Sequence, residues 1–210
     1  MTPPLVRWGD RRRGTSFPAK DRRMACAAAL GYVALGVRFS KPPRGIEERL
    51  FAWMNHQGED IPALRVPQQL GTPWVLPGIA VTAFALRKPH LTLVAGCALP
   101  VEKALEVGLK KILDRKRPAQ VDSDARLHDD APQDGPSYPS GHAAIASAAV
   151  FSLTPYVPRP VLALGVVVAG GSSAVRIHQG AHFPMDAVGG VLLGMTVASG
   201  LTAFFGRPLK

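Results

Sequence analysis

The sequence predicts an all-helical fold, a bundle of six transmembrane helices, and three observations support this class. Of the 210 residues, 47% are hydrophobic and only 19% are charged, a balance that favours a membrane-embedded domain with a sizeable core. Glycine-rich runs such as Val188-Gly189-Gly190 suit close helix packing in lipid. Six apolar stretches recur along the chain, at residues 24–39, 70–87, 90–108, 143–157, 160–175 and 187–205.

The N-terminal 23 residues differ in composition from the rest of the chain. They contain Arg11-Arg12-Arg13 and Arg22-Arg23, which predicts a basic cytoplasmic tail (1–23) before a membrane-embedded domain (24–206). A competing interpretation is a secretory signal whose apolar core is Met24–Val37. No clear small-residue cleavage site leads from that core into a soluble domain, so we favour the tail.

Residues 46–55 form a short amphipathic segment between the first two apolar stretches. Ile46, Leu50 and Trp53 recur at helical spacing, and Glu47 and Glu48 fall on the other face. The pattern predicts a short helix that lies on the membrane surface with its acids in water. An ordinary surface helix packed on its own protein is an equally good interpretation.

The net charge of +10 first suggests nucleic acid as a partner, but the basic residues are not interleaved with aromatic ones. A basic cytoplasmic face explains the charge better. With the N-terminus inside and six spans, the short basic turns near 87–90 and 156–160 also lie inside, as the positive-inside rule requires. The chain is therefore expected in the cell membrane. Its expected partner is the lipid bilayer, and we expect it to bind no nucleic acid.

This topology places three polar clusters at the outer membrane face. The first is Lys110–Pro118, in which Lys110 and Arg117 are about two helical turns apart and can share a face. Arginine offers a planar fork that matches phosphate oxygens, and lysine offers a point charge. Taken alone, such a run also fits simple anchoring at the membrane interface.

The second cluster, Ser140-Gly141-His142, precedes an Ala-rich helical segment. Ser140 is a good N-cap, and the unpaired amides of a first helical turn bind anions. Gly141 allows the backbone to approach a ligand closely. His142 would then lie beside the bound anion, although a capped helix with an incidental histidine is the plainer interpretation.

The third cluster contains Arg176, His182 and Asp186 and opens the last apolar stretch. Asp186 follows His182 by four residues and is within reach of its ring. A carboxylate bonded to one ring nitrogen fixes the tautomer and leaves the other nitrogen free to attack. Together the three clusters predict a site that holds a tetrahedral oxyanion and attacks it with an imidazole, on the outer face of the membrane.

The order and spacing of these clusters resemble the type 2 phosphatidic acid phosphatase superfamily. Its signature is Lys-x6-Arg-Pro, then Pro-Ser-Gly-His, then Ser-Arg-x5-His-x3-Asp, and the chain matches it at Lys110–Pro118, Pro139–His142 and Arg176–Asp186. One departure is Val175, where the family usually has serine. The motifs cover about 80 residues, and the six-span layout extends the resemblance over most of the chain.

The resemblance implies hydrolysis of a phosphomonoester or pyrophosphate on a membrane lipid. His182 would attack phosphorus and form a phosphohistidine, Asp186 would orient it, and His142 would protonate the leaving group. The phosphate would be bound by cations and by the start of the Ala-rich helix, namely Lys110, Arg117, Ser140, Gly141 and Arg176. No metal and no cofactor are implied, because fixed cations offset the phosphate charge.

Several other hypotheses remain open at this level. The spacing of His178, His182 and Asp186 could suit an iron or zinc ion, although neighbouring cations oppose it and Pro184 interrupts the helix. The same pocket could bind vanadate for halide oxidation, as the related haloperoxidases do, or serve a non-enzymatic lipid-binding or transport protein. The acidic loop at 119–137 is either a solvated outer loop or a substrate-selecting one.

Overall fold

The computed structural model describes residues 19–41, 43–57, 65–128 and 131–206; residues 1–18, most of the predicted tail, lie outside them. The described residues form helices and no strands, so the all-α prediction is confirmed. The elements in chain order are α1 (Ala19–Arg38), α2 (Ile46–Asn55), α3 (Arg65–Gln68), the 3-10 turn η2 (Gln69–Gly71), α4 (Val75–Ala85), α5 (Pro89–Leu113), α6 (Pro118–Val121), α7 (Gly141–Ser152), α8 (Arg159–His178) and α9 (Pro184–Phe205).

Six of these helices coincide with the six predicted apolar stretches: α1, α4, α5, α7, α8 and α9. By length and hydropathy, only α8 and α9 among the described helices are long and apolar enough to cross a bilayer. The 11 residues of α4 and the 12 of α7 rise only about 17–18 Å, less than the ~30 Å of a hydrocarbon core. The first helix starts at Ala19, earlier than predicted.

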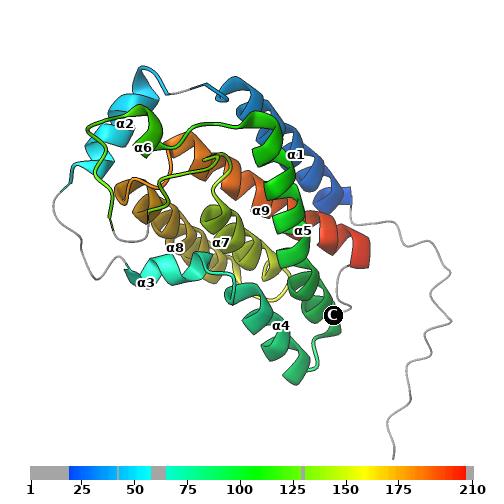
Figure 1. The fold of residues 1–210 in the computed structure, drawn as a ribbon. Coiled ribbons are helices and arrows are strands. Elements are labelled where there is room, and N and C mark those ends of the chain that lie inside the picture. The colour runs from blue at the N-terminus through cyan, green and yellow to red at the C-terminus, as the bar shows by residue number, and fades with distance from the viewer. Residues whose placement is uncertain (1–18, 42, 58–64, 129–130, 207–210) are drawn as a thin grey trace, which may run out of the picture.

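Helix α7 lies in the middle of the bundle and is buried along almost its whole length (Figure 1). The predicted close packing at Gly189-Gly190 is confirmed where α9 crosses it. A Cβ atom at Gly190 would overlap the carbonyl oxygen of Ser140, and one at Gly194 would overlap that of Ala144. Helix α9 therefore starts directly against the start of α7, which brings the second and third polar clusters together.

Helix α2 has the predicted bounds, but the prediction that Glu47 lies on a water-exposed face is wrong. Its buried residues are Glu47, Phe51 and Asn55, whereas Ile46 and Trp53 are 77% and 63% exposed. The helix is thus packed on its own protein through a partly polar face, because Glu47 forms a buried ion pair with Arg115. The apolar side chains of Ile46 and Trp53 point outward, where they suit contact with lipid, whereas that of Phe51 packs inward.

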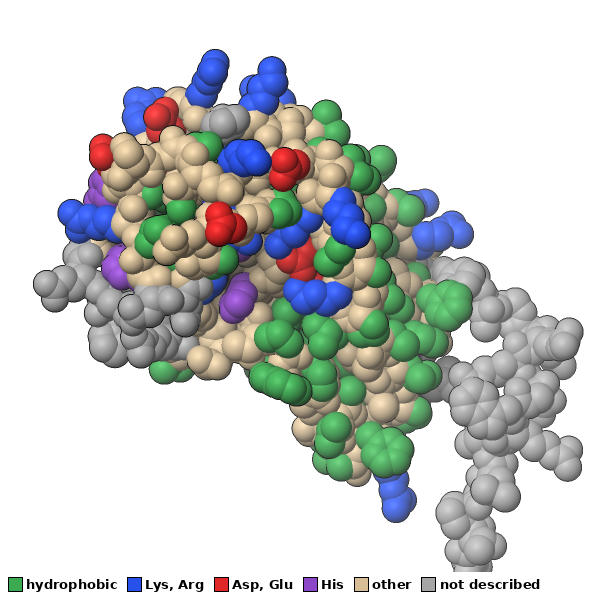
Figure 2. All heavy atoms as spheres, viewed as in Figure 1, with side chains coloured by type: hydrophobic (Ala, Val, Ile, Leu, Met, Phe, Trp, Pro, Cys, Tyr) green, Lys and Arg blue, Asp and Glu red, His purple; other side chains and the backbone are tan. Residues whose placement is uncertain are grey.

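The two ends of the molecule differ in surface character. On the face drawn in Figure 2, charged side chains and histidines gather at the end that carries α2 and α6. Hydrophobic side chains dominate the end that carries α4. A surface apolar over one half and charged over the other is typical of a membrane-associated protein.

Candidate active site

A cavity of about 190 Å³ opens at the charged end of the bundle, among α5, α7, α8 and the loops beside them. It is lined by Gly71, Pro73, Lys103, Glu106, Lys110, Arg117, Pro132, Gly141, His142, Ile145, Arg176 and His182. All three predicted clusters thus meet at one cavity. A larger cavity of about 480 Å³ lies between α4, the start of α5 and the turn after α7. Its lining is almost wholly apolar and contains none of the predicted site residues.

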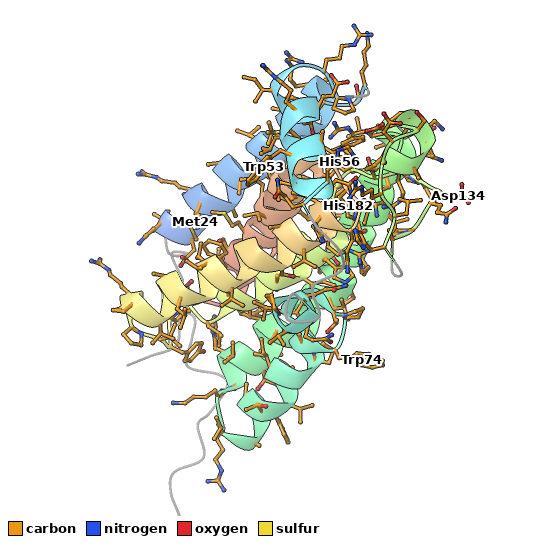
Figure 3. All side chains as sticks on the ribbon, turned by 90° about the vertical axis from the view of Figure 1, so that its left-hand side faces the viewer. Met24, Trp53, His56, Trp74, Asp134 and His182 are labelled. Carbon is orange, nitrogen blue, oxygen red and sulfur yellow. The ribbon has the colours of Figure 1, made fainter. Side chains whose placement is uncertain are left out.

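His182 lies in the short connection between α8 and α9, inside the bundle (Figure 3). Its Nδ1 atom is 3.7 Å from Oδ2 of Asp186, close enough for charge attraction but longer than a hydrogen bond. Asp186 occupies the first turn of α9 and accepts a hydrogen bond from the Phe183 amide at 2.8 Å. Asp186 does not line the cavity but lies directly behind His182.

Burial lowers the pKa of His182 to about 4, and the nearby charges of Arg117 and Lys110 act in the same direction. The negative charge of Asp186 opposes this shift without reversing it. The imidazole is therefore neutral near pH 7, with a lone pair on one ring nitrogen. That is the protonation state a nucleophile needs.

Ser140 caps α7 as predicted, with its hydroxyl oxygen 3.5 Å from the Ala143 amide nitrogen. It is fully buried and does not line the cavity, and its own amide donates to the Asp186 carbonyl at 3.0 Å. His142 follows on the first turn and faces the cavity. The turn η2 lies against it, since a Cβ atom at Gly71 would be 2.7 Å from the His142 carbonyl oxygen.

The predicted arginines are held in place by neighbouring groups. Arg117 donates from Nε to the Asp134 carbonyl and from Nη1 to the Ala181 carbonyl, both at 2.8 Å. Burial lowers its pKa, but an arginine remains charged at neutral pH. Arg176 donates from Nη1 to Oε1 of Gln179 at 2.7 Å. These fixed forks give the cavity a persistent positive charge.

The loop at 119–137 contributes directly to the site in its described part. Pro132 lines the cavity, and the Asp134 backbone holds Arg117, although the Asp134 side chain lies on the outlying loop (Figure 3). Asp129 and Asp130 lie outside the described residues. This contact favours the interpretation that the loop shapes the substrate site over that of a plain solvated loop.

Two charged residues of the cavity, Lys103 and Glu106, were not predicted as part of the site. Glu106 pairs with Lys110 at 2.6 Å and also with Lys103. It lies against the start of α7, where a Cβ atom at Gly141 would be 2.7 Å from its Oε1. The sequence pattern could have revealed them, because charged residues three and seven positions apart in an apolar stretch share a helix face and tend to point away from lipid.

His178 lies apart from this arrangement. Its ring stacks on His128 with centroids 4.8 Å apart, and its Nδ1 is 3.1 Å from the Met54 carbonyl oxygen. Across the described ranges, no three histidine, cysteine, aspartate or glutamate side chains are grouped to hold a metal ion. His178 thus contributes to packing between α8 and α2.

This chain belongs to the PAP2 superfamily, whose family model matches residues 91–209. The match spans α5 to α9 and therefore includes every predicted site residue. The chain is also similar in fold to the transmembrane PAP2-type phosphatidylglycerolphosphate phosphatase of Bacillus subtilis, with a TM-score of 0.65 and 20% identity. That likeness covers 86% of this chain and 95% of the other.

Two curated relatives are closer in sequence. An undecaprenyl-diphosphatase of Sulfolobus acidocaldarius is 33% identical over 125 residues, 57% of this chain and 59% of the relative. A decaprenylphosphoryl-5-phosphoribose phosphatase of Mycobacterium tuberculosis is 30% identical over 132 residues, 60% of this chain and 68% of the relative. The first match thus covers less than two thirds of that relative's length.

Proposed function

We propose that this protein hydrolyses a phosphomonoester or pyrophosphate group on a membrane lipid. The observation that carries the proposal is the single cavity shared by His182, His142 and the cations Lys110, Arg117 and Arg176. The names of the two curated relatives support a lipid phosphate as the substrate, since both describe phosphatases of polyprenyl lipids. Phosphatidic acid and phosphatidylglycerol phosphate carry the same reacting group.

In the first half-reaction the three cations bind the phosphoryl oxygens, and the amide of Gly141 at the start of α7 completes the binding surface. The neutral ring of His182 attacks phosphorus through Nε2. A P–N bond forms while the bond to the leaving oxygen breaks. His142, which takes up a proton when the phosphate anion binds beside it, donates that proton to the leaving oxygen. Asp186 orients the attacking ring and offsets the positive charge it acquires.

In the second half-reaction water attacks the phosphohistidine. His142, now neutral, accepts a proton from that water, the P–N bond breaks, and inorganic phosphate leaves. The lone pair returns to His182, so the site is restored. Fixed cations take the place that Mg²⁺ has in many other phosphoryl-transfer sites, so the reaction requires no metal.

We further propose that the six helices α1, α4, α5, α7, α8 and α9 form a multi-pass bundle in the cell membrane. Residues 1–23 would then be a cytoplasmic tail, and the cavity would open on the extracytoplasmic side. The charged end around the cavity and the apolar end around α4 support this placement. Single cysteines placed at exposed Lys116 and Arg87, labelled in whole cells with an impermeant maleimide, test it. We expect labelling at 116 and none at 87.

The proposed activity is tested with purified protein in detergent and a panel of lipids: a polyprenyl diphosphate, a polyprenyl phosphate, phosphatidic acid and phosphatidylglycerol phosphate. We expect phosphate release from at least one of them, retained after exhaustive chelation and lost in His182→Ala. Full activity of His182→Ala would exclude the mechanism. Vanadate should inhibit release, whereas vanadate-supported bromide oxidation would favour a haloperoxidase. A fully folded protein that releases no phosphate would favour the lipid-binding alternative.

A further inference from the structure

Arg115 lies outside the cavity and yet contacts the carboxylate that stands behind the nucleophile. Its Nη1 donates to Oδ1 of Asp186 at 2.6 Å, and its Nη2 donates to both carboxylate oxygens of Glu47 at 2.9 Å. The side chains of Arg115 and Asp186 are fully buried, and that of Glu47 is 4% exposed. One guanidinium thus joins helix α2 to the first turn of α9.

The chain between α5 and α6 is built to place Arg115 there. Helix α5 ends at Leu113, and the left-handed backbone of the next residue, Asp114 (φ 39°), turns the chain into an extended segment. Side chains then alternate: Arg115 points inward, Lys116 is 53% exposed, and Arg117 points inward to the cavity. The Arg115 carbonyl accepts a hydrogen bond from the Ser137 amide at 2.7 Å, which fixes this segment.

Glu47 is itself fixed by the turn that carries the nucleophile. Its Oε1 accepts a hydrogen bond from the Met185 amide at 3.0 Å, one of the unpaired amides at the start of α9. Below it, the Phe183 ring lies 5.1 Å from the Arg115 guanidinium and 5.0 Å from the Phe51 ring. Helix α2 therefore contacts the 182–186 turn through both a hydrogen bond to a carboxylate and aromatic packing.

This arrangement constrains how Asp186 faces His182. Arg115 holds Oδ1, and the Phe183 amide holds Oδ2, so the carboxylate has one allowed orientation. In that orientation Oδ2 is the atom nearest Nδ1 of His182. Without the guanidinium, Glu47 and Asp186 would be two buried carboxylates with no cation between them, which is strongly unfavourable.

We propose that Arg115 is a positioning residue for the proposed phosphatase reaction, held by Glu47 and acting through Asp186 on the ring of His182. The inference rests on the proposed function, because its effect is measured on the same reaction. It adds that an arginine outside the cavity and an acid on α2 determine the rate of phosphohistidine formation. Removing a group that orients a metal-binding side chain typically lowers activity about 10- to 100-fold, and we expect a factor of similar size for a group that orients a nucleophile.

The test compares neighbouring residues of the same charge that differ in burial. In Arg115→Met we expect kcat to fall about 10- to 100-fold with KM within about threefold, because substrate contacts are retained. Lys116→Met removes the adjacent exposed cation and should leave kcat unchanged. Glu47→Gln should lower kcat by a smaller factor, and the exposed neighbour Glu48→Gln should not. Arg115→Lys, which keeps the charge without the fork, should recover part of the rate.

A double variant separates positioning from plain stabilisation. If Arg115 acts through Asp186, then Arg115→Met should lower kcat by less than about twofold in an Asp186→Asn background. A loss of the same factor in both backgrounds would overturn the inference, as would wild-type kcat in folded Arg115→Met. If Arg115→Met does not fold, Glu47→Gln and Arg115→Lys take its place, and their losses of kcat are compared between the wild-type and Asp186→Asn backgrounds in the same way. A wild-type protein inactive on every lipid would overturn both proposals, whereas an active wild type with unaffected variants would overturn only this one.

Discussion

Two groups of ion pairs lie beside the cavity and differ in construction: one lines it on α5 (the α5 wall), and the other lies behind it at the start of α9 (the α9 wall). On the α5 wall, Glu106 pairs with Lys103 and Lys110, whose side chains are 42% and 18% exposed. On the α9 wall, Arg115 joins Asp186 and Glu47, and the three side chains are buried almost completely. Lysine offers a single mobile point charge, whereas arginine offers a planar fork that fixes two partners at once.

The difference indicates a division of labour. On the α5 wall the Glu106 carboxylate pairs with the ammonium of Lys110, which binds phosphate in the proposed reaction. Phosphate binding would therefore require those ion pairs to rearrange. On the α9 wall no ion pair has to break, because Arg115 and Glu47 do not line the cavity. We therefore expect changes on the α5 wall to alter binding and changes on the α9 wall to alter the chemical step.

The largest effect should come from removing the charge of Asp186 on the α9 wall. In Asp186→Asn the carboxylate that offsets the charge on His182 is lost, and the amide can favour the wrong ring tautomer. We expect kcat to fall on the order of 10³-fold with little change in KM. Steady-state kinetics on the preferred lipid measures this, with the thermal midpoint as a control for folding. A loss that appears mainly in KM would contradict the division of labour.

Two glycines sharpen the comparison through stability. A Cβ at Gly190 meets the backbone of Ser140, which cannot move, whereas a Cβ at Gly141 meets the end of the Glu106 side chain, which can. We expect Gly190→Ala to lower the thermal midpoint in detergent by at least about 5 °C, and Gly141→Ala to lower it by much less. Equal losses would mean that the two walls are equally rigid.

Much of the site could be predicted from the sequence because its chemistry is carried by motifs with defined spacing. Lys110, Arg117, Gly141, His142, Arg176 and His182 all reach the cavity as expected. The helical class and the bounds of α2 followed from apolar periodicity. These features depend on residues near one another in the sequence, or on a pattern of spacing that a single chain displays.

The remaining features depend on pairs that are distant in sequence. Glu47 was expected in water because helical periodicity shows which residues share a face but not which face is buried. Its cation, Arg115, is 68 residues away, and only the fold brings the two together. Ser140 was expected to bind phosphate, yet packing of α9 against α7 buries it behind the cavity. The apolar stretches predicted at 70–87 and 143–157 also contain turns, one before α4 and one after α7, so these two helices are shorter than the stretches.

A smaller effect is expected at Glu106, on the α5 wall. Glu106→Gln removes a negative charge that competes with phosphate for Lys110 and Lys103. We expect inorganic phosphate or vanadate to inhibit about three- to fivefold more tightly, the size typical of a partly solvated charge pair, with kcat changed less than tenfold. Glu48→Gln, an exposed acid on α2, is the matched control. Weaker inhibition would show that Glu106 holds the lysines in their binding positions.

The smallest expected change is in the titration of His182 itself. Its pKa is lowered from the usual value near 6.5 to about 4, mainly by burial, so the ring should stay neutral from pH 7 down to about pH 5. Ring carbon chemical shifts of ¹³C-labelled histidine in detergent micelles measure this directly, with His182→Ala assigning the signal. Between pH 4 and 6.5 the unfolded chain binds more protons at this residue than the folded protein does, so acidification should lower the thermal midpoint. In His182→Ala that pH dependence should be weaker. A ring that titrates near pH 6.5 would mean that water reaches the α9 wall, and the contrast between a rigid wall and an exchangeable one would fail.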